Sequence, residues 1–180
     1  SDVSGGIYNP DGLNVPAILD YLSLNRKNLL KDYNEEGMSR ITNEELLEMD
    51  VRVLVPAALE NQINASNAHK IRAEVIVEAA NGPVAADADG ILQDRGITVV
   101  PDILANAGGV VVSYFEWVQN IQSVSWTEEE VNEKLKNIMD PAFEAVWDIA
   151  MKQNATLRTG AYLIAVKRVV EAKAARAIWP

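Results

Sequence analysis

The chain has 180 residues, 48% of them hydrophobic, and a formal net charge of -10 at pH 7, which suits a single acidic domain with a buried core. Its basic residues are dispersed, so neither nucleic acid nor an anionic membrane surface is an expected partner. With no cysteine and one histidine, His69, the chain offers no disulfide framework, thiol nucleophile or histidine-rich metal centre, and we expect no metal.

The first part of the chain is predicted to alternate between strands and helices. Short apolar runs that end at proline, glycine or asparagine indicate buried strands, and longer periodic runs indicate helices. In chain order we expect turns over 5–14, a helix over 16–31, a polar loop over 34–40, a capping box at 42–45 that opens a short helix, a strand over 51–55, a helix over 60–72 with His69 on its surface, a strand over 73–77, a helix over 86–95 and a strand over 97–100. This order predicts parallel βαβ units.

From about Leu104 onward the pattern predicts helices alone. We expect them over 108–121, 128–152 and 157–176, with a capping box at 127–130 and a kink or restart at Pro141. The predicted fold is therefore an α/β domain with a parallel sheet of about three strands over 1–103, followed by an all-helical portion over 104–180. No segment reaches the about 20 uninterrupted apolar residues of a membrane span, and the first residues resemble no leader, so we expect a cytoplasmic protein.

The segment 101–117, PDILANAGGVVVSYFEW, joins a strand, a glycine-containing turn and a helix. Gly108 and Gly109 allow backbone to approach a flat ligand, and the Asn106 side chain can donate and accept hydrogen bonds at once. Ligands of open α/β sheets bind at the carboxyl ends of strands, where this segment lies. The alternative is a helix start that needs small residues only for packing.

This segment, extended to PDILANAGGVVVSYFEWVQN, closely resembles the cofactor and substrate corner of the glutamate, leucine, phenylalanine and valine dehydrogenases. Three further segments resemble the same family in the same order: SDVSGGIYNPDGL, ITNEELLEMDVRVLVPAALENQI and VEAANGP. The resemblance implies a partial NAD(P)-binding domain over 1–180 with an incomplete Rossmann-like sheet. The family's G-x-G-x-x-G loop and its amino-terminal substrate domain, with the catalytic lysine and aspartate, are missing, so no catalytic residue is expected in this chain.

The resemblance assigns five positions to the NAD or NADP cofactor. Asp2 would accept hydrogen bonds from the adenosine ribose and disfavour a 2′-phosphate, which favours NAD. Ala57 and Ala58 would line the dinucleotide path, and Asn81 and Asn106 would contact the nicotinamide half. Without the family resemblance, Asp2 would be a terminal surface acid, and Ala57 and Ala58 would form a tight strand-to-helix turn. Asn81 followed by Gly82 would be a common pair of turn residues.

Two positions on the corner helix are assigned to the substrate. Spacing of three places Val110 and Ser113 on one face, and the family uses these positions for the methylenes and the distal carboxylate of glutamate. Ser113 could instead be an ordinary exposed helix serine. Val84 and Ala85 stand where the family usually has hydroxyl side chains, which affects either the nicotinamide side or the cap of the next helix.

The expected function is the dinucleotide-binding part of an enzyme that oxidises L-glutamate to 2-oxoglutarate and ammonia with NAD(P). By resemblance the complete enzyme is a homo-oligomer, a hexamer. Two alternatives stay open: a non-catalytic fragment that keeps the fold as a binding module, and a dehydrogenase for another amino acid. The lysines fall in helical patterns rather than glycine-rich pockets, so acid and base groups are expected from the missing domain.

Overall fold

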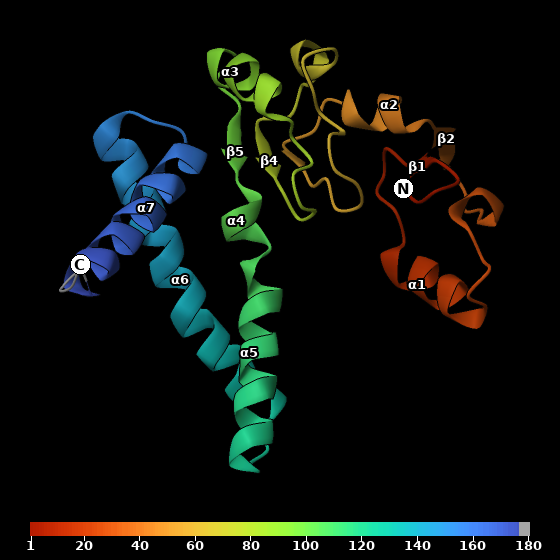
Figure 1. The fold of residues 1–180 in the computed structure, drawn as a ribbon. Helices are drawn as coiled ribbons and strands as arrows, with labels where there is room; N and C mark the ends of the chain where they lie inside the picture. The colour runs from red at the N-terminus through yellow and green to blue at the C-terminus, as the bar shows by residue number, and fades with distance from the viewer. Residues whose placement is uncertain (177–180) are drawn as a thin grey trace. The chain divides into compact units, whose positions relative to one another are not determined.

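The computed structural model describes residues 1–176, and their contacts separate into two compact units. The first comprises residues 1–50 together with Lys70–Arg72, and the second comprises Val51–His69 and the chain from Ala73 onward. Figure 1 labels the elements of each unit. The predicted boundary at 103/104 follows a different feature, because it separates the strand-containing part of the chain from the helical part.

The first unit contains a two-stranded antiparallel sheet and short helices. Gly6 pairs with Ile41 and Tyr8 with Ser39. The buried side chains of Ile7, Ile18, Leu30 and Tyr33 form its core. The elements are β1 (Gly6–Tyr8), α1 (Val15–Leu24), the 3-10 helix η1 (Leu30–Asp32), β2 (Ser39–Ile41) and α2 (Asn43–Leu47).

Several predictions for this unit were wrong. The turn at 5–14 and the loop at 34–40 each contain a strand, too short and too polar on one side for the pattern to be seen. The helix predicted over 16–31 ends at Leu24, because Asn25 is extended and its side chain accepts from the Lys27 amide. The capping box at Thr42 is confirmed, with both reciprocal hydrogen bonds present.

The second unit contains the predicted parallel sheet of three strands, which confirms the α/β fold class. The order is β3-β4-β5, for β3 (Val53–Leu54), β4 (Val75–Val77) and β5 (Thr98–Val100). Leu54 pairs with Ile76, and Val77 pairs with Val100. Helix α3 (Ala86–Asp94) connects β4 to β5, which makes a βαβ unit at the predicted place.

The helix predicted over 60–72 was wrong. Only η2 (Ala68–Lys70) is helical there, and the exposed His69 lies on it. The preceding residues pair instead with the loop after β4: the Asn61 amide donates to Gly82 O at 2.8 Å, and the Ile63 amide donates to Pro83 O at 2.9 Å. These bonds and the complete burial of Ile63 replace the helical ladder that the sequence pattern indicated.

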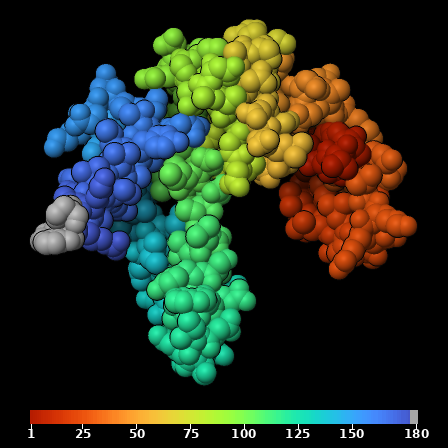
Figure 2. All heavy atoms as spheres, viewed as in Figure 1, coloured from red at the N-terminus to blue at the C-terminus, as the bar shows by residue number. Residues whose placement is uncertain are grey.

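The rest of the described chain is helical, as predicted: α4 (Asp102–Ala105), α5 (Ala107–Gln122), α6 (Glu128–Gln153) and α7 (Leu157–Arg176). The Thr127 capping box is confirmed. The expected restart at Pro141 was wrong, because α6 continues through this exposed position. The end of α5 and the start of α6, cyan-green in Figure 2, extend away from the strands of their own unit.

Helices α6 and α7 pack against each other and against the start of α4. The shared core consists of Leu104, Val146, Ala150, Leu157 and Ala161. This core ties α4, which follows β5 directly, to the two long helices. None of the helices in the described part of the chain combines the length and the apolar character that a bilayer crossing requires.

Candidate functional site

The carboxyl ends of the three parallel strands form one edge, and each is followed by a segment that carries predicted site residues. Ala57 and Ala58 follow β3, Asn81 follows β4, and Asn106 follows β5. The register places Leu54 beside Ile76 and Val77 beside Val100, so these exits are neighbours. This edge is where open α/β sheets bind their ligands.

Asn81 and Asn106 contact each other through their side chains. Asn106 Nδ2 donates to Asn81 Oδ1 at 2.7 Å and to the backbone oxygen of Ala80 at 3.3 Å. A backbone carbonyl only accepts, so the second bond fixes which end of the Asn106 amide faces the β4 loop. Among the described residues, no hydrogen bond engages Asn81 Nδ2 or Asn106 Oδ1. The pair therefore offers one donor and one acceptor to a ligand.

The turn after β3 lies against the same loop. The backbone oxygen of Pro56 accepts from the Ala79 amide at 3.1 Å and from the Ala80 amide at 2.9 Å. Ala57 and Ala58 follow directly and are exposed, while Pro56 is buried. Two methyl-sized side chains are thus held beside the Asn81 loop, and no described residue covers them.

The glycines of α5 have open space around them. A Cβ on Gly109 would meet nothing within 4 Å, and one on Gly108 would meet only the Leu135 side chain at 3.8 Å. Packing within the described residues therefore does not require glycine here. Val110 and Ser113 are both exposed and lie on one face of α5.

Asp2 belongs to the first unit, and its carboxylate has local partners. Oδ1 accepts from the Ser4 amide at 2.7 Å and from the Ser4 hydroxyl at 2.5 Å, and Oδ2 accepts from the Leu30 amide at 2.8 Å. Burial alone would raise the pKa of Asp2, but these hydrogen bonds outweigh it and hold the pKa below its ordinary value. The carboxylate thus stays ionised and stabilises the turn of residues 2–5.

The unusual Val84 and Ala85 have different surroundings. Val84 is buried, and its amide donates to Glu78 Oε1 at 3.2 Å. Ala85 occupies the N-cap of α3, where no side chain accepts from the helix. Ala85 therefore gives α3 no side-chain cap, and Val84 places an apolar side chain in the core.

A cluster of charged side chains next to these loops was not predicted from the sequence. Glu78 is fully buried, and its Oε1 lies 2.8 Å from Nη2 of Arg158 on α7. The only sequence signal was a glutamate placed directly after an apolar strand, in VIVEAANGP. Its partner lies eighty residues further along the chain, beyond the reach of local patterns.

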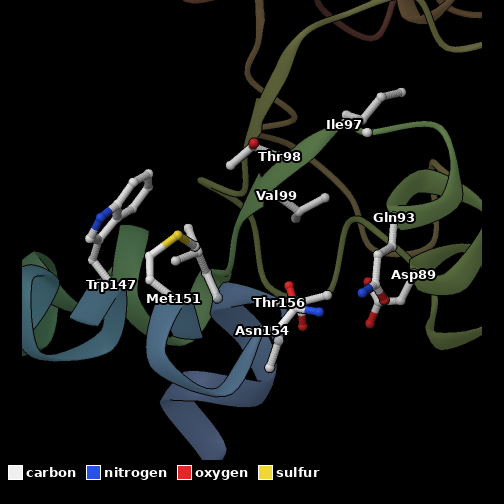
Figure 3. A pocket seen from close by; sticks show the side chains of 12 residues that line it. Asp89, Gln93, Ile97, Thr98, Val99, Trp147, Met151, Asn154 and Thr156 are labelled. Atoms are coloured by element: carbon white, nitrogen blue, oxygen red, sulfur yellow. The ribbon is translucent and has the colours of Figure 1, made fainter. Parts of the chain in front are cut away.

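A pocket of about 230 Å³ lies elsewhere in the second unit (Figure 3). It is bordered by the start of β5 at Thr98, by Trp147 and Met151 of α6, and by Thr156 in the connection between α6 and α7. None of the predicted site residues lines it. It is near the amino end of β5, whereas the candidate site is at the carboxyl ends of the strands.

A parallel βαβ sheet with polar side chains gathered at its carboxyl edge defines an α/β domain of the nucleotide-binding kind. The model of the Glutamate/Leucine/Phenylalanine/Valine dehydrogenase family matches residues 1–177. The chain belongs to this family, which confirms the resemblance inferred from its motifs.

Individual relatives agree with this assignment. The chain is 51% identical over 172 residues to the catabolic NAD-specific glutamate dehydrogenase RocG of Bacillus subtilis, covering 96% of this chain and 39% of the relative. It is 52% identical over 182 residues to the NADP-specific glutamate dehydrogenase A1 of Halobacterium salinarum, covering 100% and 43%. The chain thus spans about two fifths of the length of these relatives.

Solved structures show the same relationship. The hetero-hexameric glutamate dehydrogenase of Thermus thermophilus, in its leucine-bound form, matches 98% of this chain and 40% of its own, with a TM-score of 0.85 and 32% identity. The glutamate dehydrogenase of Plasmodium falciparum matches 99% and 40%, with a TM-score of 0.86 and 29% identity.

Proposed function

We propose that this chain supplies the dinucleotide-binding part of an enzyme that oxidatively deaminates L-glutamate to 2-oxoglutarate and ammonia with NAD or NADP. The observation that carries the proposal is the asparagine pair at the carboxyl edge of the sheet. Its free donor, Asn81 Nδ2, and its free acceptor, Asn106 Oδ1, complement a carboxamide, which has one acceptor and one donor group. A nicotinamide carries such a carboxamide, and when bound it supplies the hydride acceptor.

We assign the remaining cofactor residues to other parts of the same dinucleotide. Ala57 and Ala58 present small exposed side chains beside the Asn81 loop, which leaves room for a sugar against backbone. We assign Asp2 to the adenosine ribose, on the family resemblance alone. Its carboxylate stays ionised under its lowered pKa, as a ribose acceptor must. The open space at Gly109 gives a flat ring access to the start of α5.

The substrate contacts are proposed on α5. Val110 and Ser113 are exposed on one helix face, so the valine can contact the methylenes of glutamate while the serine hydroxyl donates to its distal carboxylate. This pairing favours glutamate over an amino acid with a purely apolar side chain. It also distinguishes the proposal from the alternative of a dehydrogenase for another amino acid.

The protein's part in the reaction is orientation. The asparagine pair fixes the carboxamide, and the serine fixes the substrate, so that both reactants are held in one geometry. Every lysine of the chain is exposed, and no described lysine lies among the site residues. We therefore propose that the acid and base groups lie outside this chain.

We further propose a cytoplasmic enzyme that assembles as a homo-oligomer, a hexamer. The support is the hexameric assembly of the Thermus thermophilus relative, which is itself a hetero-hexamer. Size-exclusion chromatography with light scattering on the complete protein measures the assembly. A monomer at micromolar concentration contradicts it.

Steady-state kinetics of the complete protein with L-glutamate and either NAD or NADP test the proposed activity. We expect turnover with at least one cofactor in the complete protein, and none from the 180-residue chain alone. Turnover by the chain alone would mean that the acid and base groups lie within this chain. No turnover by the complete protein with glutamate, but turnover with an apolar amino acid, would select the alternative substrate, and a lack of turnover with both would favour a non-catalytic module.

A further inference from the structure

Arg158, the second residue of α7, lies among three carboxylates: Glu78 directly after β4, Asp89 on α3 and Asp102 on α4. Its Nη2 lies 2.8 Å from Glu78 Oε1, its Nε lies 2.9 Å from Asp89 Oδ2, and its Nη1 lies 3.5 Å from Asp102 Oδ1. The Nε contact is ionic, off the line of a hydrogen bond. The Arg158 side chain is 19% exposed and the Glu78 side chain 0%. Solvent therefore screens the Glu78 contact little.

The two carboxylates nearest the asparagine pair bind backbone amides around it. Glu78 accepts from the Val84 amide at 3.2 Å and from the Asp102 amide at 2.7 Å. Asp102 Oδ2 accepts from the Gly82 amide at 2.8 Å. The loop that carries Asn81 is thus fastened at Gly82 and Val84. The start of α4, which leads to Asn106, is fastened to Glu78 through the Asp102 amide.

These bonds depend on charge. A buried carboxylate without a counterion takes up a proton or draws in water, because its charged form is poorly solvated in the interior. Glu78 uses both carboxylate oxygens as acceptors, Oε1 for the Val84 amide and Arg158 and Oε2 for the Asp102 amide. Arg158 supplies the only positive charge in contact with Glu78 among the described residues.

The surroundings of Arg158 also favour its charged form. Burial would lower the pKa of Arg158, but the hydrogen bond and charge of Glu78 and the charge of Asp89 outweigh it and raise the pKa above its ordinary value. The guanidinium of Arg158 therefore stays charged at neutral pH.

We propose that Arg158 is a positioning residue for the Asn81 and Asn106 pair, which it holds in register through Glu78 and Asp102. Arg158 does not touch the ligand in this arrangement. It couples the last helix of the chain to the geometry of the cofactor site. The proposal rests on the proposed nicotinamide role of the two asparagines.

A double-mutant cycle on the complete enzyme tests it, using Arg158→Gln, Asn106→Ala and the double variant. We expect Arg158→Gln to lower kcat by no more than the roughly tenfold expected of Asn106→Ala, since Arg158 acts through the asparagine pair, with a smaller change in the cofactor KM. The double variant should have the kcat of Asn106→Ala alone. Arg158→Lys, which keeps the charge, should restore part of kcat. Arg168→Gln, exposed on the same helix, is the matched control and should leave kcat unchanged.

Hydrogen-exchange mass spectrometry supplies a readout that does not depend on activity. In Arg158→Gln, peptides that cover 78–85 and 101–106 should exchange faster than in the wild type, and those of α5 should not. If Arg158→Gln does not assemble, the combined Arg158→Gln and Glu78→Gln variant removes both buried charges and is measured in its place.

The outcomes separate the two proposals. The positioning role would be overturned if the double variant lost kcat by the product of the two single losses. It would also be overturned if hydrogen exchange in both peptides were the same as in the wild type. The proposed function would stand in either case. A normal kcat in Asn106→Ala would overturn the nicotinamide role and, with it, the catalytic meaning of Arg158.

Discussion

Asn106 Nδ2 and Asn81 Oδ1 lie 2.7 Å apart, and this hydrogen bond joins the loop after β4 to the junction of α4 and α5, which follow the neighbouring strand β5. The bond determines which polar atoms of the pair remain for a ligand. Each asparagine uses one half of its amide on the other, and the outward halves are a donor on Asn81 and an acceptor on Asn106. The two residues therefore act as one unit.

Replacing Asn106 by alanine removes both the acceptor and the support of Asn81. In the complete enzyme we expect kcat to fall about tenfold, since one net hydrogen bond contributes about 0.5 to 1.5 kcal/mol. The dissociation constant of the cofactor should change less, because the amide chiefly orients the ring. Single-turnover kinetics and cofactor titration measure the two effects. Asn137→Ala, exposed on α6, is the control, and a normal kcat in Asn106→Ala would remove the residue from the site.

Ser113→Ala should weaken glutamate binding specifically. A hydrogen bond to a charged group contributes about 1.5 to 3 kcal/mol, so the KM for glutamate should rise roughly ten- to a hundredfold. A substrate of similar length without the distal carboxylate should be little affected. Ser23→Ala provides the control, because Ser23 is an exposed helix serine whose hydroxyl donates to the Asp20 backbone oxygen. Equal changes with both substrates would assign Ser113 to structure.

The sequence predicted the second unit better than the first, for a physical reason. Val75–Val77 and Thr98–Val100 are apolar runs between breakers, and α6 has a capping box and an apolar stripe, so local patterns suffice there. β1 and β2 pair across more than thirty residues in a sheet of only two strands, and their sequences, GIY and SRI, form no apolar run. The helix expected over 60–72 gave way to pairing with a distant loop that no local pattern reveals.

The candidate site divides in the same way. Motif resemblance indicated Asn81 and Asn106, and the structure places them in contact. Arg158 was not indicated, because an arginine near a helix start is unremarkable until the fold brings it to Glu78. Residues that touch a ligand leave a local motif, whereas residues that support them are defined by long-range packing.

Gly160 and Gly90 should respond oppositely to alanine. A Cβ on Gly160 would lie 2.9 Å from the Val146 backbone oxygen and 3.1 Å from the Ala150 Cβ, where α6 and α7 meet. Gly160→Ala should therefore cost about 1 to 3 kcal/mol through overpacking. A Cβ on Gly90, inside α3, would meet nothing within 4 Å. Gly90→Ala should stabilise by about 0.5 to 1 kcal/mol. Thermal unfolding of the two variants measures both effects. Equal shifts of the melting temperature would contradict the close contact between α6 and α7.

Hydroxyl side chains introduced at Ala85 and at Val84 should change the stability of the protein in opposite directions. Ala85 has φ -70 and ψ 150, the extended conformation of an N-cap residue, and no side chain caps α3. Ala85→Ser should supply the missing acceptor and stabilise the protein by about 1 kcal/mol. The reverse change at a working cap, Thr127→Ala at the start of α6, should cost about the same amount.

Val84→Thr is the matched test at the neighbouring position. Val84 is buried and its amide already bonds to Glu78, so the new hydroxyl would enter the core. An unpaired buried hydroxyl costs about 1 to 3 kcal/mol, and we expect the melting temperature to fall where Ala85→Ser raises it. Differential scanning calorimetry of both variants measures the shifts. Stabilisation by Val84→Thr would show that a polar partner for the hydroxyl is present, and the departure at Val84 would then concern the cofactor side of the loop rather than the core.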